Sequence, residues 1–301
     1  MSLTADIQSL YRLRYLSGVA LAVIVYDHLL TLDEEFSTIW ASKSRDYLQK
    51  LMFVANRYYT EAMVMYVVYV SSGSADLDNE VSPIARVSID VETDPRIVVL
   101  VWIIRPYPSC RQFIWVFALT STLFTAITHF FITLRLYHSW DKRKRMAVIL
   151  VAAFVAFISA AAALAIMSAF QVQSVIYYVP FLKVCRIPDI PGTFPYMMGT
   201  LLGFDLFIIL LALFNAFERP HKTHADVLDA LHRDGARLFL AVFLMRLVCL
   251  VMSIVAMPAD CFGILNVMWT LTAIISSRIH LRVEGLKFAT LGWARTSVLV
   301  L

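Results

Sequence analysis

The chain has 301 residues, of which 60% are hydrophobic and 16% charged, and its mean hydropathy is +0.72. Soluble domains are closer to half apolar and a quarter charged, so this composition excludes an ordinary water-soluble fold. The net charge of +4 is too small to indicate a nucleic-acid partner, and four cysteines are too few for a disulfide-rich framework.

Seven apolar stretches follow one another along the chain. A helix needs about 20 residues to cross roughly 30 Å of hydrocarbon, so the sequence predicts an all-α, polytopic bundle of seven transmembrane helices in a single membrane domain. We expect the first stretch to be a retained signal anchor, because it is too long for a cleavable signal and lacks a small-residue cleavage site. The predicted spans are residues 15–32, 48–70, 113–136, 146–170, 196–217, 236–256 and 261–277.

Polar segments separate these spans. Residues 71–109 form an outer loop that we interpret as an insertion, and its apolar run, 97–104, would rise only about 12 Å as a helix, too little to cross. Residues 171–195 are expected to be a loop because they contain four prolines. Apolar residues at helical spacing predict a short interfacial helix within 218–235 and another in the tail, 278–301.

The distribution of basic residues predicts the orientation, because Lys and Arg accumulate on the cytoplasmic side of membrane proteins. With seven spans, 16 Lys and Arg fall on the side of the C-terminus and 8 on the side of the N-terminus. This bias predicts an outside N-terminus and a cytosolic C-terminus, a receptor-like topology, in either the plasma membrane or an internal membrane.

The predicted orientation indicates which cysteines could form a disulfide. Cys110 precedes the third predicted span and Cys185 lies in the loop after the fourth, so both fall on the outer side, where an oxidising compartment permits a disulfide. Cys110–Cys185 is therefore the candidate disulfide. The alternatives are two free thiols, or Cys261 as the partner of one of them.

Several charged residues lie inside the predicted spans, where charges are costly and normally face the bundle interior. Helix rise puts Asp205 about 14 Å below the outer end of its span and Arg246 about 15 Å above the inner end of the next, so the two can pair near the midplane. Asp27 and Arg57 lie at matching depths and could pair likewise, with Glu61 sharing Arg57. The candidate intramembrane polar cluster is Asp27, Arg57, Glu61, His129, Asp205 and Arg246. These residues either fix the helix register or line a polar cavity for a ligand, an ion or a proton.

The sequence lacks the residues that retinal binding, phosphate binding and nucleophilic catalysis require. All seven lysines lie outside the interiors of the predicted spans, which excludes a retinal Schiff base, and the sequence contains no phosphate-binding loop and no nucleophile elbow. We expect no catalytic residues, no cofactor and no metal site. The acidic and histidine residues near 221–232 are interpreted as a solvated loop at the membrane interface rather than as metal ligands; they are His221, His224, Asp226, Asp229 and His232.

Polar residues recur at fixed spacings at the end of the first predicted span, just after it, and within the second span. They are Tyr26-Asp27-His28-Leu29-Leu30-Thr31-Leu32-Asp33-Glu34-Glu35, Ile39-Trp40 and Asn56-Arg57-Tyr58. This pattern resembles a fungal, basidiomycete-type family of seven-helix membrane proteins, known as domain of unknown function 6533. The resemblance is strongest over residues 15–70 and implies a membrane location and seven helices, but no activity. The chain departs from the family in the long segment 71–109 and in Asp205, where the family often has glutamate.

We expect a receptor-like signalling or sensing protein, whose partners are the bilayer, a small-molecule or lipid ligand and a cytosolic protein at the basic inner loops. Two alternatives remain open. One is an ion- or proton-coupled transporter or channel that uses the buried acids, although no broken helices or repeats are visible in the sequence. The other is an intramembrane enzyme that acts on a lipid or isoprenoid with buried carboxylates, which needs two acids converging on one cavity.

Overall fold

A computed structural model describes residues 3–40, 47–73, 110–140, 143–179, 184–218 and 226–299 of the chain. Within these ranges it contains seven α-helices, which confirms the predicted all-α class. The helices are α1 (Leu3–Glu35), α2 (Tyr47–Ser71), α5 (Cys110–Ser139), α6 (Lys144–Gln173), α7 (Thr193–Glu218), α8 (Asp226–Val255) and α9 (Pro258–Leu299). A π-helical turn, η1 (Phe36–Trp40), extends α1. The apolar run 97–104 lies outside the described residues.

Five segments of the described part are long and apolar enough to cross a membrane, which indicates a multi-pass membrane protein. They are Ile7–Trp40, Cys110–Tyr137, Lys144–Gln173, Thr193–Asn215 and Pro258–Arg282. The apolar part of α8, Phe239–Val255, is shorter. α2 is not among the five, since Arg57 and Glu61 in its middle lower its hydropathy.

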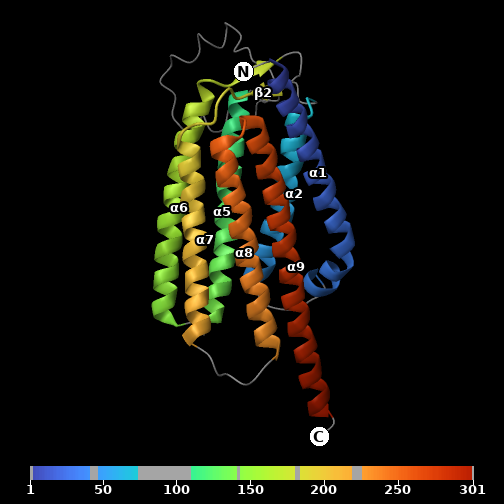
Figure 1. Cartoon of the computed structure of the whole chain (residues 1–301). Coiled ribbons are helices and arrows are strands. Elements are labelled where there is room, and N and C mark those ends of the chain that lie inside the picture. Colours follow the sequence, from blue (N-terminus) through green and yellow to red (C-terminus); the bar gives the residue numbers. More distant parts are fainter. Residues whose placement is uncertain are drawn as a thin grey trace, which may run out of the picture.

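The helices run side by side along one axis, with the two ends of the chain at opposite ends of the bundle (Figure 1). α1 packs on α9 and α2 at one edge, and α6 packs on α5 and α7 at the other. α8 contacts both α7 and α9 and so connects the two groups. Each helix therefore turns one side toward the interior of the bundle.

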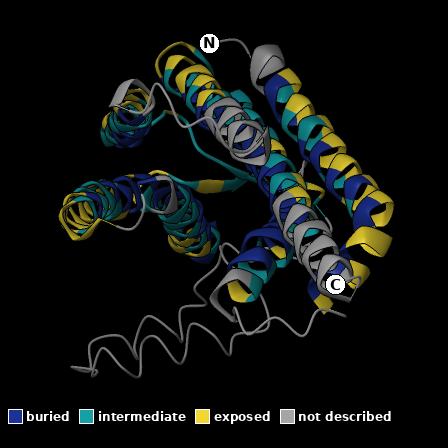
Figure 2. Ribbon diagram, turned by 90° about the horizontal axis from the view of Figure 1, so that it is seen from below, coloured by how far each residue is buried: buried dark blue, intermediate teal, exposed yellow. Residues whose placement is uncertain are grey.

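Burial follows this arrangement, with buried residues facing the interior and exposed residues on the outer surface (Figure 2). The outward side of α6 carries Val148, Val151 and Val155, which are 69%, 58% and 57% exposed. Val255 in α8 is 72% exposed. A continuous apolar surface of this kind is unfavourable in water but suits the hydrocarbon of a bilayer.

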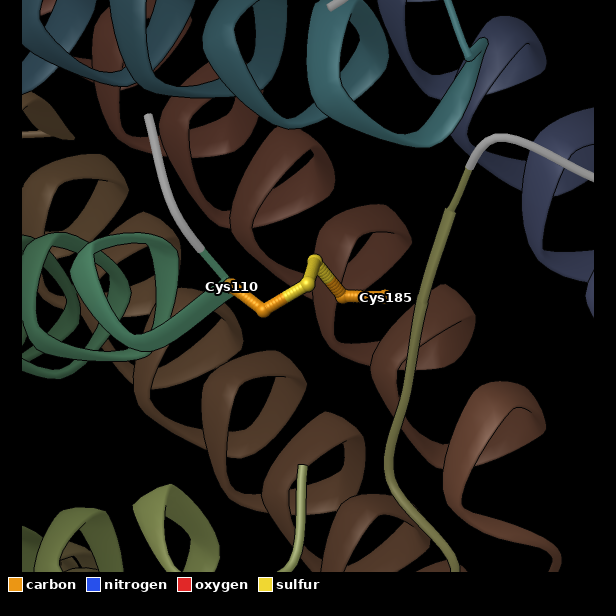
Figure 3. Close-up of a disulfide and its surroundings, with 2 residues drawn as sticks. All are labelled: Cys110 and Cys185. Atoms are coloured by element: carbon orange, nitrogen blue, oxygen red, sulfur yellow. A yellow bond between two sulfur atoms is a disulfide. The ribbon is translucent and has the colours of Figure 1, made fainter. Parts of the chain in front are cut away.

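A short antiparallel hairpin, β1 (Tyr177–Val179) and β2 (Val184–Arg186), lies in the segment predicted to be a loop. Val184 of the hairpin packs with Leu10 of α1. Cys185 in β2 forms a disulfide with Cys110, the first residue of α5, and this is the pair expected from the sequence (Figure 3). We call this end of the bundle the disulfide end.

Two helices continue through segments that were predicted to form separate interfacial helices. α8 begins at Asp226 and runs into the apolar part without a break, and α9 continues to Leu299 as one helix of 42 residues. Both segments are helical as predicted, but each is continuous with the neighbouring span rather than a separate helix. No proline follows Pro258, and none lies between Asp226 and Val255, so neither helix contains the residue that interrupts helices most strongly.

α9 packs closely against α1 at Gly263. A Cβ atom at this position would lie 2.9 Å from Leu16 Cδ1 and 3.7 Å from Leu13 Cα. In contrast, a Cβ at Gly199 would meet nothing within 4 Å. Glycine at 263 thus allows the two helices to pack closely.

We therefore expect Gly263→Leu to push α1 away from α9 and to lower the free energy of unfolding by about 1–3 kcal/mol, the usual cost of overpacking. Gly199→Leu is the matched control, and it should leave stability within about 0.5 kcal/mol because its site is open. Thermal unfolding of both variants in detergent provides the measurement. Equal midpoints for the two variants would contradict the packing described here.

Candidate functional site

One face of α1 carries polar side chains into the bundle. Asp27, Thr31 and Glu35 recur every four residues, so they lie on the same side of the helix. All three are buried, with exposed fractions of 6%, 6% and 0%. The helix persists to Glu35 because no proline or glycine follows Gly18 within it.

Glu35 and Arg57 form the most deeply buried ion pair of this face. Arg57 Nε lies 3.3 Å from Glu35 Oε2, and the side chains are 4% and 0% exposed. The other carboxylate oxygen, Oε1, accepts hydrogen bonds from the Tyr58 hydroxyl at 2.6 Å and from Trp40 Nε1 at 3.0 Å. η1 brings Trp40 back to the carboxylate, so Oε1 accepts from two donors, whereas Oε2 contacts Arg57 Nε without hydrogen-bond geometry.

Arg57 also binds the backbone and side chains of α1. Its Nη2 donates to Thr31 Oγ1 at 2.5 Å and to the His28 carbonyl at 3.3 Å. This guanidinium therefore joins α2 to two successive turns of α1. Such a fork is a property of arginine that lysine cannot reproduce.

Two further pairs extend the same region. Arg278 of α9 donates to Asp27 Oδ1 at 2.6 Å, and His28 Nδ1 lies 2.9 Å from Glu61 Oε2 of α2. Arg278 is 53% exposed whereas Asp27 is 8% exposed. We call this set the ion network, and it consists of Asp27, His28, Thr31, Glu35, Trp40, Arg57, Tyr58, Glu61 and Arg278.

The pairing predicted for this region was wrong. Asp27 pairs with Arg278 rather than with Arg57, and Glu61 contacts His28 rather than Arg57. Glu35, which lies beyond the first predicted span (15–32), is the partner of Arg57 because α1 extends to that residue. The matching depths of residues on α1 and α2 were not enough to predict these ion pairs, because Asp27 takes its partner from a third helix, α9.

A second cluster joins α5, α7 and α8. Arg246 Nε lies 3.1 Å from Asp205 Oδ2, the pair expected from the sequence, and the side chains are 2% and 4% exposed. His129 Nε2 lies 3.9 Å from Asp205 Oδ1, and its ring packs on Phe204 at a centroid distance of 4.7 Å. The Arg246–Asp205 contact lacks hydrogen-bond geometry, and Arg246 Nη1 has no hydrogen-bond partner.

The six predicted site residues thus fall into two groups. Asp27, Arg57 and Glu61 belong to the ion network, and the other three form the cluster around Asp205. The sequence analysis missed the roles of His28, Glu35 and Arg278. His28 and Glu35 stand in the motif that carried the family resemblance, so the motif itself was the available signal.

In the described part of the chain, Phe117 of α5 lines three pockets that lie toward the disulfide end. The first, which we call the Arg246 pocket, has apolar and hydroxyl-bearing walls from α5, α7 and α9 and includes Arg246 and Trp269. The second, the hairpin pocket, is lined by Cys185, Val67 and Asn266. The third lies between α5, α6 and α7. The pockets and the ion network therefore occupy different parts of the bundle.

Within the described residues, no group of three or more histidine, cysteine, aspartate or glutamate side chains could hold a metal ion. The side chains of the predicted solvated loop, including His221 and His224, lie outside that part of the chain. The chemistry available to the described polar residues is therefore charge pairing and hydrogen bonding.

Comparison with known families gives one match, over parts of α1 and α2. Residues 15–60 match the model of DUF6533, a family of unknown function. The predicted resemblance is confirmed over these residues, and no curated protein matches the chain. The DUF6533 segment contains seven of the nine members of the ion network, all except Glu61 and Arg278. The polar motif of the family segment therefore builds one contact network between α1 and α2.

We predict that Glu35 and Arg57 are energetically coupled. Arg57→Met alone leaves the Glu35 carboxylate buried without its cation, and should lower the free energy of unfolding by about 3–5 kcal/mol. The double variant Glu35→Gln/Arg57→Met should lose less than the sum of the two single variants. Thermal unfolding of the four proteins in detergent measures the coupling.

The exposed pair Arg12–Asp260 provides the control, because its atoms approach to 2.8 Å but the arginine is 52% exposed. Arg12→Gln should change stability by no more than about 1 kcal/mol. Additive losses at Glu35 and Arg57 would mean that their contact stabilises nothing.

Proposed function

We propose that this chain is a receptor-like sensing protein, in which an occupied pocket near the disulfide end alters charge pairing in the ion network. The proposal rests on one observation, that the same helices carry both features. Trp269 of α9 lines the Arg246 pocket, and Arg278 of the same helix, about 13 Å further along, contacts Asp27. In α2, Val67 lines the hairpin pocket while Arg57, about 15 Å away, binds Glu35.

Exposure indicates which contact can change. Arg278 is 53% exposed and can reach water, so opening its pair leaves one buried charge, Asp27, without a partner, whereas breaking the pair of Arg57 and Glu35 would leave two. A small shift of α9 would therefore break the Asp27–Arg278 pair first. Packed helices have discrete alternative arrangements rather than a continuum, so this pair is suited to distinguish two states.

The orientation with the N-terminus outside belongs to the same proposal. Three observations support it: the two ends of the chain lie at opposite ends of the bundle (Figure 1), the disulfide is near the N-terminal end, and basic residues are more frequent on the other side. A cytosolic partner would then meet the end that carries Arg278.

A polar seam along α9 favours transport as the second candidate. Asn266, Thr270 and Ser277 are 0%, 1% and 2% exposed, and each has a buried side-chain oxygen without a hydrogen-bond partner. Such a seam could guide an ion or a proton. The enzyme alternative has less support, because in the described residues Asp27, Glu35, Glu61 and Asp205 each contact a basic side chain.

The sensing proposal predicts two conformations that differ at the end opposite the disulfide. Spin labels at Leu32→Cys of α1 and Val148→Cys of α6 would report their separation, since these positions are 48% and 69% exposed and lie on opposite edges of the bundle. Background labelling should be small because the free cysteines, Cys249 and Cys261, are buried. We expect Arg278→Gln to increase the population of a second distance severalfold in pulsed electron resonance.

A single distance that Arg278→Gln leaves unchanged would contradict the sensing proposal. Proteoliposomes that contain a pH-sensitive dye provide the opposing test. Protein-dependent proton or cation flux, lost in Asn266→Leu, would favour transport through the α9 seam instead.

A further inference from the structure

A basic segment stands at the start of α6, just before its apolar part. The sequence Lys142-Arg143-Lys144-Arg145 places four basic residues together, and the three that the structure describes, from Arg143 on, are exposed. The first turn of α6 contains no acidic residue. α6 runs along one edge of the bundle toward the disulfide end (Figure 1). The basic segment therefore lies at the opposite end, on a helix at the periphery of the molecule.

An exposed apolar stripe continues directly from Lys144. Val148, Val151 and Val155 follow it at the spacing of one helical face, and each is more than half exposed. Helix rise makes the stripe from Lys144 to Val155 about 16 Å long. This is about half of the roughly 30 Å of hydrocarbon in a bilayer. The stripe thus has the length of one acyl chain in one leaflet.

The side chains of Lys144 and Arg145 extend away from this stripe. Side chains on a helix lean toward its N-terminus, and the N-terminus of α6 is the end that emerges from the apolar part of the bundle. Long basic side chains at such positions lay their methylene groups along apolar surface and place their charge in the headgroup layer. The basic ends and the valine stripe can therefore contact the headgroup and the chain of one lipid.

Charge decides which headgroup fits. A zwitterionic headgroup brings its own cation to a basic surface, whereas an anionic headgroup brings complementary charge, and each Lys or Arg near the surface increases the affinity for anionic lipid about fivefold. The same end of α1 has the opposite charge, since Asp33 and Glu34 are exposed there. They follow an exposed apolar stripe that consists of Tyr26, Leu29 and Leu30. α6 and α1 thus offer similar apolar surfaces next to charges of opposite sign.

We propose that the start of α6 binds an anionic phospholipid. Lys144 and Arg145 contact the phosphate and the acidic headgroup, and one acyl chain lies along the stripe from Val148 to Val155. This site uses neither the pockets nor the ion network, so it goes beyond the sensing proposal and does not rest on it. The bundle would then have one preferred lipid neighbour at the end opposite the disulfide.

The test compares two photoreactive lipids with the full-length protein in phosphatidylcholine nanodiscs. Phosphatidylserine and phosphatidylcholine carry the same diazirine-labelled acyl chain, each is added in trace amount, and mass spectrometry quantifies the labelled peptides after irradiation. At residues 148–155, phosphatidylserine should label about tenfold or more above phosphatidylcholine, given two basic residues. At residues 26–30 the ratio should be one or lower, because Asp33 and Glu34 repel the anionic headgroup.

Two double variants separate a local site from the overall charge of the protein. Lys144→Gln/Arg145→Gln should lower the labelling ratio at residues 148–155 by about fivefold or more. Arg12→Gln/Arg111→Gln removes the same charge from exposed positions at the disulfide end, and should leave that ratio unchanged. All four side chains are exposed, so both variants should unfold at about the wild-type temperature.

Three results would overturn the lipid site. They are equal labelling of residues 148–155 by the two lipids, an equal excess of phosphatidylserine at residues 26–30, and an equal fall of the ratio in both double variants. Glycerophosphoserine, which has the headgroup without the chains, tests whether a soluble phosphate suffices. Labelling that persists in its presence at millimolar concentration supports a lipid, whereas full suppression means that the valine stripe contributes nothing and contradicts the proposal.

Discussion

The ion pair between Glu35 and Arg57 is the contact on which the packing of the first two helices depends. Neither charge reaches solvent, with exposed fractions of 0% and 4%, so each would be strongly unfavourable without the other. Tyr58 and Trp40 complete the shell of the carboxylate. These requirements fix how far α1 extends, how η1 turns and which face α2 presents.

The remaining charged contacts follow the same rule with different exposure. Asp205 and Arg246 are buried together in the second cluster, whereas Arg278 is half-exposed against Asp27. A pair in which both charges are buried stabilises one arrangement, whereas a pair with one half-exposed partner opens at a lower cost. The bundle therefore combines two ion pairs that must persist with one, between Asp27 and Arg278, that can change. The pockets lie toward the other end of the bundle.

The sequence was sufficient where one physical rule decides the outcome. Apolar length predicted the helices, and the midplane depths of Asp205 and Arg246 brought those two together correctly. It was insufficient where several helices compete for one charge, as for Asp27, whose partner comes from α9, 251 residues away. Helix ends were equally hard, since the apolar pattern of the first span stops before Glu35, and the helical spacing of the tail did not show that it continues α9 without a break.

Acids of α1 are neutralised by basic residues of α2 and α9, and a charge exchange at Asp27 and Arg278 is the measurement that tests this pairing. Asp27→Lys alone places two cations together, and Arg278→Glu alone places two anions together, so each should lower the midpoint of thermal unfolding in nanodiscs. The double variant restores an opposite-charge pair and should recover most of the loss. A double variant less stable than either single variant would contradict the account.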